Sequence, residues 1–315
     1  MRALVTGGAG FIGSNVVDAL RARGNEVAVV DDLSTGRIEN LEEALASGVT
    51  FHQLDIREAD AVAAAFESAR PELVFHLAAQ VDVRRAIADP AFDASVNVVG
   101  TINVLEAAHA SGARRLINTS TGGAIYGETE VLPTPETVVP APVSAYGQSK
   151  QCAELYCAWV GRARGLETVT LRYGNVYGPR QDPLGEAGVI AIFVGHMLSG
   201  RRPTIFGDGS AVRDYTFVSD IVAANLLAAD TTGLSGCINI GTGVGSSLLD
   251  VFDAISDVIG SSGAIEPHFL PSRLGEINRS ILDVTLAGEV LGFSADVGLW
   301  EGISATIAGL QPQRD

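Results

Sequence analysis

The sequence predicts an α/β protein with a doubly wound parallel sheet of about seven strands and a smaller mixed α/β lobe toward the C-terminus. Apolar runs and helical stretches alternate five times before residue 175, which is typical of a right-handed parallel sheet. A glycine-rich turn joins the first apolar run to the first helix. A chain of 315 residues also lies near the length at which one hydrophobic core divides into two. We therefore expect two lobes, the first of which contains the sheet.

Composition indicates a globular protein and excludes several classes of partner. Hydrophobic residues make up 47% of the chain and charged residues 18%, which is unlike a disordered sequence. The formal net charge of −16 argues against nucleic acid or an anionic membrane as the main partner. We find neither a signal peptide nor an apolar run of membrane-spanning length. We therefore expect a cytoplasmic protein.

The thiols and imidazoles show no metal-binding pattern. Cys152, Cys157 and Cys237 form neither a disulfide framework nor a metal-ligand spacing, so we expect buried reduced thiols. The five histidines are scattered, without an H-x-x-x-H cluster. We predict that the protein binds no metal.

The first element is a short strand at 3–5 that runs into the turn 6–13 and then into a helix ending near residue 24. Strand, glycine turn and helix in this order are the context that a dinucleotide fingerprint requires. Gly7 permits a tight turn, Gly10 lets the backbone approach a pyrophosphate, and Gly13 lets helix and strand pack closely. Free N–H groups at the helix N-terminus would then face the phosphates.

The second strand, at 27–30, ends at Asp31, about twenty residues past the glycines, where a carboxylate can accept both ribose hydroxyls of adenosine. A carboxylate there repels a 2′-phosphate, so NAD is favoured over NADP. The alternative for Asp31 is a helix N-cap or turn residue. A third strand at 49–54 would place Asp55 and Ile56 beside the adenine.

A fourth strand at 73–79 ends in small residues that leave room for a cofactor, and a fifth follows at 115–119. His76 lies inside the fourth strand, where a histidine is more often structural than catalytic. A proline-containing loop at 128–143 leads to a helix at about 146–164. That helix and a second one at 91–112 offer apolar faces for dimerisation, although core packing explains them almost as well.

The C-terminal half continues with a sixth strand at 168–172 and a helix at about 189–199. A seventh strand at 237–241 would return to the first lobe. We therefore expect a dinucleotide-binding domain at 1–175 with a returning segment at about 213–245. The ranges 176–212 and 246–315 would form the second domain.

Tyr146 and Lys150 lie four residues apart at the start of the helix at 146–164, so their side chains share one face. A phenol ionises at about pH 10 and is a poor base at neutral pH. A nearby ammonium favours the phenolate, and a positively charged nicotinamide would favour it further. The pair could then take a proton from a sugar hydroxyl. An exposed helix face is the alternative explanation.

Taken together, these motifs resemble the extended short-chain dehydrogenase/reductase superfamily, with a Rossmann-type sheet, and most closely its nucleotide-sugar 4-epimerases. The resemblance covers nearly the whole chain. Besides Tyr146 and Lys150, it rests on the segments 6–13, 31–36, 76–80, 175–180, 213–215 and 273–276.

The resemblance implies a tightly held NAD that is reduced and reoxidised within one turnover. Tyr146 would remove the proton of the sugar 4-hydroxyl, and the 4-keto sugar would rotate before reduction on its other face. Lys150 would hold the nicotinamide ribose and lower the pKa of Tyr146. The residues that would contact the cofactor are Gly7, Gly10, Phe11, Ile12, Gly13, Asp31, Asp32, Ser34, Thr35, Gly36, Asp55, Ile56, Leu77, Ala78, Ala79, Gln80, Thr119, Tyr146, Lys150, Tyr173 and Val176.

The chain departs from the commonest family pattern between Thr119 and Tyr126, where the loop is about one residue longer. A hydroxyl from this turn should bond the same sugar oxygen as Tyr146. We choose Thr121, with Ser120 as the second candidate. The alternative is that all three hydroxyls of residues 119–121 only satisfy loop backbone.

The same turn separates related reactions. Sugar 4,6-dehydratases of this superfamily carry an Asp-Glu pair where this chain has Gly123 and Ala124, which can act as neither acid nor base. The related decarboxylases also tend to carry an acidic residue there. The resemblance therefore favours epimerisation without elimination.

For the substrate, the family pattern places Arg213 and Arg273 on the diphosphate, since arginine binds phosphate oxygens in pairs. Asn175 would donate to the phosphates, and Glu276 would reach the uridine ribose. Surface salt bridging is the alternative for each arginine. The full set implied for the substrate is Thr121, Gly122, Gly123, Tyr146, Asn175, Gly188, Val189, Thr204, Ile205, Phe206, Arg213, Arg273 and Glu276, of which 204–206 would line the uracil.

Several functions remain open from the sequence. The simplest is interconversion of UDP-glucose and UDP-galactose. The small Ser280 would leave room for N-acetyl groups, and Arg180 or a neighbouring donor could meet the carboxylate of UDP-glucuronate. Other nucleotide-sugar reactions of short-chain dehydrogenases and, from another class, a non-catalytic NAD-binding regulator are the further alternatives.

Overall fold

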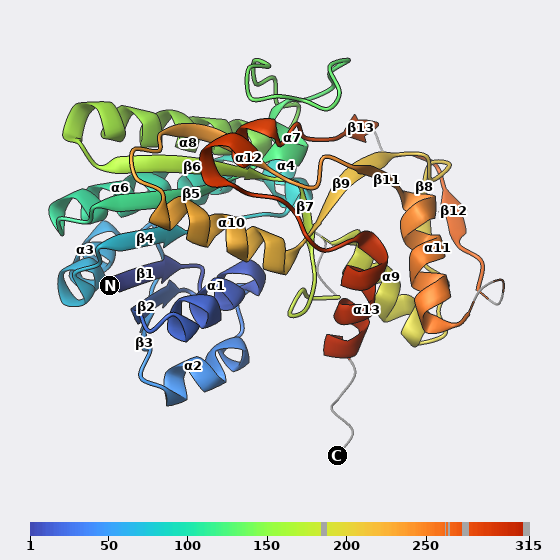
Figure 1. Cartoon of the computed structure of the whole chain (residues 1–315), viewed down its shortest axis with the longest axis horizontal. Coiled ribbons are helices and arrows are strands. Elements are labelled where there is room, and N and C mark those ends of the chain that lie inside the picture. The colour runs from blue at the N-terminus through green and yellow to red at the C-terminus, as the bar shows by residue number, and fades with distance from the viewer. Residues whose placement is uncertain (184–187, 262, 264, 273–276, 311–315) are drawn as a thin grey trace.

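A seven-stranded parallel sheet forms the larger of two lobes in the computed structural model, which describes residues 1–183, 188–261, 263, 265–272 and 277–310 (Figure 1). The strand order is β10-β6-β5-β4-β1-β2-β3. This order confirms the predicted doubly wound Rossmann-type sheet. The strands are β1 (Arg2–Thr6), β2 (Glu26–Asp31), β3 (Thr50–Gln53), β4 (Leu73–His76), β5 (Arg115–Thr121), β6 (Glu167–Tyr173) and β10 (Gly236–Ile240).

Helices cover both faces of this sheet. Along β1, Ala3 and Val5 pack into one apolar layer while Leu4 packs into the other, because successive strand residues point to opposite faces. The helices on the first face are α1 (Phe11–Ala22), α2 (Glu42–Ala46), α10 (Val218–Asp230) and α12 (Thr285–Leu291). Those on the second face are α3 (Ala59–Ala69), α6 (Thr101–Ala110) and α8 (Ala145–Arg164).

The strand β10 joins the sheet from far along the chain. It pairs with β6 in parallel, with Cys237 opposite Thr170. The preceding helix α10 is fixed by Arg115 of β5, whose fully buried guanidinium donates to the carbonyls of Ala228 (2.7 Å) and Ala229 (3.1 Å). These are carbonyls at the C-terminus of α10, where a cation is favourable. The 213–245 segment is therefore bound to the sheet at both its helix and its strand.

The smaller lobe is mixed, as predicted. A four-stranded sheet contains β7 (Asn175–Tyr177), β9 (Val212–Phe217), β11 (Gly245–Ser247) and β13 (Arg279–Ser280), and a pair is formed by β8 (Thr204–Phe206) and β12 (His268–Leu270). The helices α9 (Val189–Leu198), α11 (Leu248–Ile259) and α13 (Leu299–Leu310) enclose its apolar core.

Asp214 connects the two lobes. Its buried Oδ1 accepts hydrogen bonds from Thr242, and its Oδ2 accepts from the amides of Gly243 (3.0 Å) and Leu282 (3.4 Å). Burial raises the pKa of this carboxyl, and the same hydrogen bonds oppose the shift. The residue thereby fixes β9 against the turn that follows β10 and against the segment leading to α12.

The helical segment predicted at 91–112 differs in detail. It begins at α5 (Pro90–Ala94), passes through a π-helix η2 (Ser95–Gly100) and continues as α6. Three shorter elements lie between the strands and helices already named, namely η1 (Ile38–Leu41), α4 (Val83–Ala88) and α7 (Gly122–Ile125). Periodicity predicted the helical run but not its wide turn, because a single inserted residue barely changes the apolar pattern.

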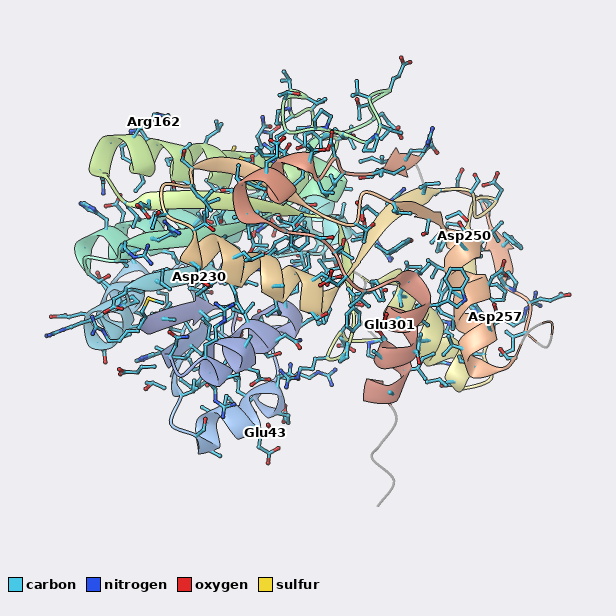
Figure 2. The ribbon with its side chains drawn as sticks, viewed as in Figure 1. Glu43, Arg162, Asp230, Asp250, Asp257 and Glu301 are labelled. Carbon is cyan, nitrogen blue, oxygen red and sulfur yellow. The ribbon has the colours of Figure 1, made fainter. Side chains whose placement is uncertain are left out.

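Acidic side chains account for the net charge by their spread over both lobes rather than by one patch. Figure 2 shows Glu43, Asp230, Asp250 and Glu301 on separate elements. No helix among the described residues is both long and apolar enough to span a membrane. The described part of the chain likewise contains no cluster of three His, Cys, Asp or Glu side chains that could hold a metal.

Candidate active site

The sequence motifs meet at the carboxyl edge of the sheet, where β1, β2, β4, β5 and β6 end. The glycine turn follows β1 directly. Asp31 is the last residue of β2, and Thr121 is the last residue of β5. Ligands of open α/β sheets bind at this edge. The helices α1 and α8 begin beside it.

The glycine turn is tightly enclosed, which explains its composition. Gly7 has a φ of +69°, and a Cβ on it would lie 2.6 Å from the backbone nitrogen of Ala78. A Cβ on Gly13 would lie 2.0 Å from the carbonyl oxygen of Gly7. The N-cap Gly10 offers no side chain to the first amides of α1, so these N–H groups can serve an anion.

Asp31, the predicted ribose-binding carboxylate, is the last residue of β2. Its Oδ2 accepts from the amide of Ala9 and its Oδ1 from that of Leu33, both at 2.9 Å. Burial raises the pKa of Asp31, and these two amides oppose the shift. Each carboxylate oxygen can accept a further hydrogen bond. A Cβ on Gly36 would lie 2.7 Å from Oδ1, so the carboxylate is closely framed and the site fits a dinucleotide.

Some residues expected to contact the cofactor use their side chains in hydrogen bonds or core packing within the protein. Tyr173 is buried, and its hydroxyl accepts from Asn225 at 2.7 Å. The Gln80 amide bonds Asp82 and Asp93. Ile56 is part of the apolar core. These side chains are thus engaged within the protein, and contact of the three residues with NAD stays a prediction.

The remaining cofactor candidates lie along the edge. Asp55 forms a two-oxygen ion pair with Arg57, and the Asp32 carboxylate accepts from the amide of Ser34 at 2.9 Å. Leu77, Ala78 and Ala79 are partly exposed where β4 ends. Thr119 presents its carbonyl to Lys150. Their roles toward NAD stay predictions.

Lys150 is buried, and its Nζ donates to the carbonyl of Thr119 at 2.9 Å. Burial lowers the pKa of this ammonium to about 8, while Asp93, Cys157 and Glu154 oppose the shift. Its helix α8 begins sharply because Ser144 accepts from the amide of Gly147 at 3.1 Å, as an N-cap does.

Tyr146 lies one turn before Lys150 and is partly exposed. Burial of the phenol raises its pKa, the charge of Asp93 raises it further, and a hydrogen bond with Thr121 opposes both. The sequence-based expectation was a pKa lowered by Lys150. In the protein alone the pKa of Tyr146 is instead raised, mainly by burial.

The three candidate hydroxyls differ in their surroundings. Thr121 bonds the Tyr146 side chain, whereas the Thr119 hydroxyl lies 3.3 Å from the hydroxyl of Tyr173. The Ser120 hydroxyl is buried and has no hydrogen-bond partner. Of the three, Thr121 therefore shares a hydrogen bond with the phenol.

His76 is a structural residue in this site. One ring nitrogen lies 2.7 Å from the Thr6 hydroxyl and the other 3.0 Å from the Thr101 hydroxyl. Burial and the charge of Lys150 lower the pKa of His76 to about 3. The ring is therefore neutral and satisfied, as the sequence suggested.

Asp93 is a site residue that the sequence did not indicate. It is fully buried on α5, and its charge acts on both Tyr146 and Lys150. In the sequence it follows Phe92 without any motif. An aspartate on a helix is usually solvated, so sequence patterns gave no signal for it.

On the substrate side, a Cβ on Gly123 would lie 3.1 Å from Oδ1 of Asn175. Arg213 donates to the carbonyls of Val212 (2.9 Å) and Asn278 (3.3 Å), beside Ser280 of β13. Gly188 and Val189 lie at the start of α9. Arg273 and Glu276 lie outside the described residues.

The three residues expected at the uracil do not share one face. Ile205 is fully buried in the core of the smaller lobe, whereas Thr204 and Phe206 are partly exposed. Alternation along β8 explains this. The expectation is thus wrong for the Ile205 side chain and stays a prediction for the other two.

Known proteins share both the sequence and the fold. Residues 3–241 match the model of the NAD dependent epimerase/dehydratase family. A UDP-glucose 4-epimerase from Mycolicibacterium smegmatis is 47% identical over 98% of this chain and 97% of its own. A Thermotoga maritima UDP-glucose 4-epimerase, solved with UDP-glucose, superposes with a TM-score of 0.94 at 46% identity, covering 98% of each chain.

A Thermus thermophilus UDP-glucose 4-epimerase, solved in complex with NAD, gives a TM-score of 0.90 at 44% identity and also covers 98% of each chain. These matches extend over both lobes, and the glycine turn, Asp31 and the Tyr146–Lys150 pair lie within the matched family region. The chain therefore belongs to the NAD dependent epimerase/dehydratase family.

Proposed function

We propose that the protein is an NAD-dependent isomerase that interconverts the 4-epimers of a UDP-hexose, most simply UDP-glucose and UDP-galactose. One observation carries the proposal: Tyr146, hydrogen-bonded to Thr121, stands one helical turn from Lys150 at the edge that also carries the glycine turn. Family membership and the 47% identical epimerase support the same reaction. A regulator would have no use for a phenol, hydroxyl and ammonium at one point.

In this proposal the residues divide the work. Bound NAD supplies a reversible hydride acceptor. Tyr146 accepts the proton of the sugar 4-hydroxyl and returns it after the 4-keto sugar has rotated to present its other face. Thr121 donates to or accepts from the same oxygen and orients the phenol. Lys150, held by the Thr119 carbonyl, places a positive charge one turn away and stabilises the phenolate when it forms.

Elimination reactions are disfavoured by the residues at 123 and 124. A carboxylate at Gly123 would have to displace Asn175, whose Oδ1 lies 3.1 Å from where a Cβ would stand. Neither Gly123 nor Ala124 can remove or supply a proton. The 4-keto sugar consequently has no acid–base pair for loss of water at this turn.

Two residues, Ser280 and Arg180, narrow the choice of sugar. Ser280 lies on β13 opposite Arg213, and its small side chain supports acceptance of N-acetyl groups. Arg180, the candidate for a uronate carboxylate, instead pairs with Asp18 of α1 at 2.7 Å. UDP-glucose and UDP-N-acetylglucosamine are therefore preferred over UDP-glucuronate.

The test is to incubate purified protein with UDP-glucose, UDP-N-acetylglucosamine and UDP-glucuronate separately, and to resolve products by chromatography and proton NMR. A 4-epimer that forms without net change in free NADH supports the proposal and names the sugar. Net oxidation or reduction would indicate a dehydrogenase instead. No product from any sugar, with NAD still bound to the protein, would leave other nucleotide sugars and then the regulator.

Thr121→Ala is expected to lower kcat because it removes the hydroxyl that bonds the phenol. A hydrogen bond to a charged group is worth about 1.5–3 kcal/mol, so the expected loss is about ten- to a hundredfold. Ser120→Ala is the matched control and should change kcat less than twofold. Both are measured by initial rates under saturating substrate. The opposite order would make Ser120 the catalytic hydroxyl.

We further propose that the protein forms a homodimer through α8 and the helical segment from α5 to α6. Leu155, Trp159 and Val99 are exposed on these helices, at 63%, 43% and 48% of their surface. By contrast, Val104 and Val160 are core residues. Sedimentation velocity should show a dimer for the wild type and a monomer for a Leu155→Glu/Trp159→Glu variant. A dimer that survives both changes would place the interface elsewhere.

A further inference from the structure

The side chain of Asp93 is fully buried. It belongs to α5, which packs against α8, the helix of Tyr146 and Lys150. An ionised carboxylate in such a place is costly unless nearby groups compensate its charge. Its neighbours therefore indicate what it does.

The two carboxylate oxygens of Asp93 have different surroundings. Oδ1 accepts from the amide groups of Gln80 (2.8 Å) and Asn97 (3.0 Å). Oδ2 is buried as well and has no hydrogen-bond partner. Most buried polar atoms are paired, so an unpaired carboxylate oxygen on a helix that packs against α8 needs an explanation beyond helix packing.

The amides that hold Oδ1 are themselves fixed. Asn97 Oδ1 accepts from the backbone amide of Gln80, and its Nδ2 donates to the Gln80 carbonyl, both at 2.9 Å. Asn97 lies in the π-helix η2, which begins at Ser95, where α5 has ended. Such wide turns occur often at functional sites. Here the turn orients Asn97 toward the end of β4 and so locks the Asp93 carboxylate in place.

The other titratable groups around Tyr146 and Lys150 are either paired or neutral. From α8, Glu154 accepts hydrogen bonds from Nε and Nη2 of Arg172 at 2.9 and 2.6 Å. Burial raises the pKa of Cys157 to about 12, which keeps its thiol neutral. From β4, His76 is neutral as well. Among the described residues, no ion pair involves Asp93, and its negative charge opposes the burial that lowers the pKa of Lys150.

We propose that Asp93 is a positioning residue whose fixed, buried carboxylate on α5 sets the charge environment of Tyr146 and Lys150 on the adjacent helix α8. This inference rests on the proposed epimerase function. A fixed negative charge favours the ammonium and opposes an early phenolate. It does so without touching the sugar, because Asp93 acts through the two α8 side chains.

The direction of each effect gives a test. Burial lowers the pKa of Lys150 to about 8, and Asp93 opposes that shift. Burial raises the pKa of Tyr146, and Asp93 adds to that rise. Loss of the Asp93 charge should thus lower both pKa values. The acid and base limbs of the pH–kcat profile would then move together toward lower pH.

Asp93→Asn removes the charge while keeping the side-chain size and an oxygen acceptor for Gln80 and Asn97. We expect both limbs of the profile to move down by about one pH unit. Asp89→Asn is the matched control: it removes a charge from the same helix start, where exposed Asp89 caps the Phe92 amide, and asparagine caps equally well. Its profile should equal that of the wild type.

A lower kcat with unmoved limbs would mean that Asp93 only supports the packing, and would overturn the proposal. A second readout needs no substrate: the tyrosinate absorbance difference between each protein and its Tyr146→Phe counterpart. The phenolate of Tyr146 should appear at lower pH in Asp93→Asn. This titration separates failure of the inference from failure of the epimerase assignment. If neither Asp93→Asn nor Asp93→Ser folds while Asp89→Asn does, the role is structural and the proposal fails.

Discussion

Replacement of Tyr146 by phenylalanine is expected to lower kcat for UDP-hexose epimerisation by about a hundred- to ten-thousandfold, the contribution of one positioned acid–base group. The ring and its packing are kept, but the oxygen that exchanges a proton with the sugar is lost. Thr121 and Lys150 remain in place and cannot replace it, since Lys150 is directed to the Thr119 carbonyl. Initial rates at saturating substrate measure the effect.

Tyr156→Phe provides the matched control for this prediction, because Tyr156 lies on the same helix with 40% of its surface exposed. It should retain wild-type kcat. Bound NAD, released by denaturation and quantified, should be equal in all three proteins. Substantial epimerisation by Tyr146→Phe would exclude the phenol as the proton acceptor and leave the proposed mechanism without its base.

Arg172→Met is expected to reduce the free energy of unfolding by about 3–5 kcal/mol, because it leaves Glu154 as an uncompensated buried charge. Arg172 and Glu154 are both buried and joined by two short hydrogen bonds. Arg172 also donates to the Tyr126 hydroxyl at 2.8 Å, which in turn donates to Asn239 at 2.7 Å. The change therefore disturbs β6, α8 and β10 together. Denaturant unfolding monitored by circular dichroism measures the loss.

The double variant Arg172→Met/Glu154→Met should recover most of this stability, since apolar pairs often replace buried ion pairs at little cost. Arg162→Met, on the exposed side of α8 (Figure 2), should stay within about 0.5 kcal/mol of the wild type. If the double variant is as unstable as Arg172→Met, the cost comes from lost packing and hydrogen bonds rather than from the stranded carboxylate.

The sheet, the glycine turn and the Tyr146–Lys150 pair were predictable because their sequence signals are local. The turn after β1 shows its need for Gly7 and Gly13 in the sequence, and each strand of the larger lobe is a compact apolar run. The spacing of Tyr146 and Lys150 follows from helix geometry alone. The choice of Thr121 over Ser120 also agrees with the hydrogen bond to the phenol, although its catalytic role stays a prediction.

What the sequence could not show depends on contacts between distant segments. Asp93 carries no motif, and its effect comes from the packing of α5 against α8. Ile205 and Tyr173 looked like ligand contacts, yet the structure places their side chains in the core. The Tyr146 pKa was misjudged for the same reason: a sequence reveals the spacing of Tyr146 and Lys150 but not the burial that raises the pKa of the phenol. Desolvation is a property of the assembled fold.

The position of β10 also has a consequence for synthesis. Until Gly236–Ile240 leaves the ribosome, β6 remains an open edge with unpaired backbone groups, and α10 cannot yet meet the guanidinium of Arg115. Open edges invite pairing with other chains, and partly formed domains are prone to aggregation. Translation past residue 240 is thus the step that pairs β6 and completes the seven strands, so chains truncated within 174–235 should accumulate as aggregates rather than as a smaller stable domain.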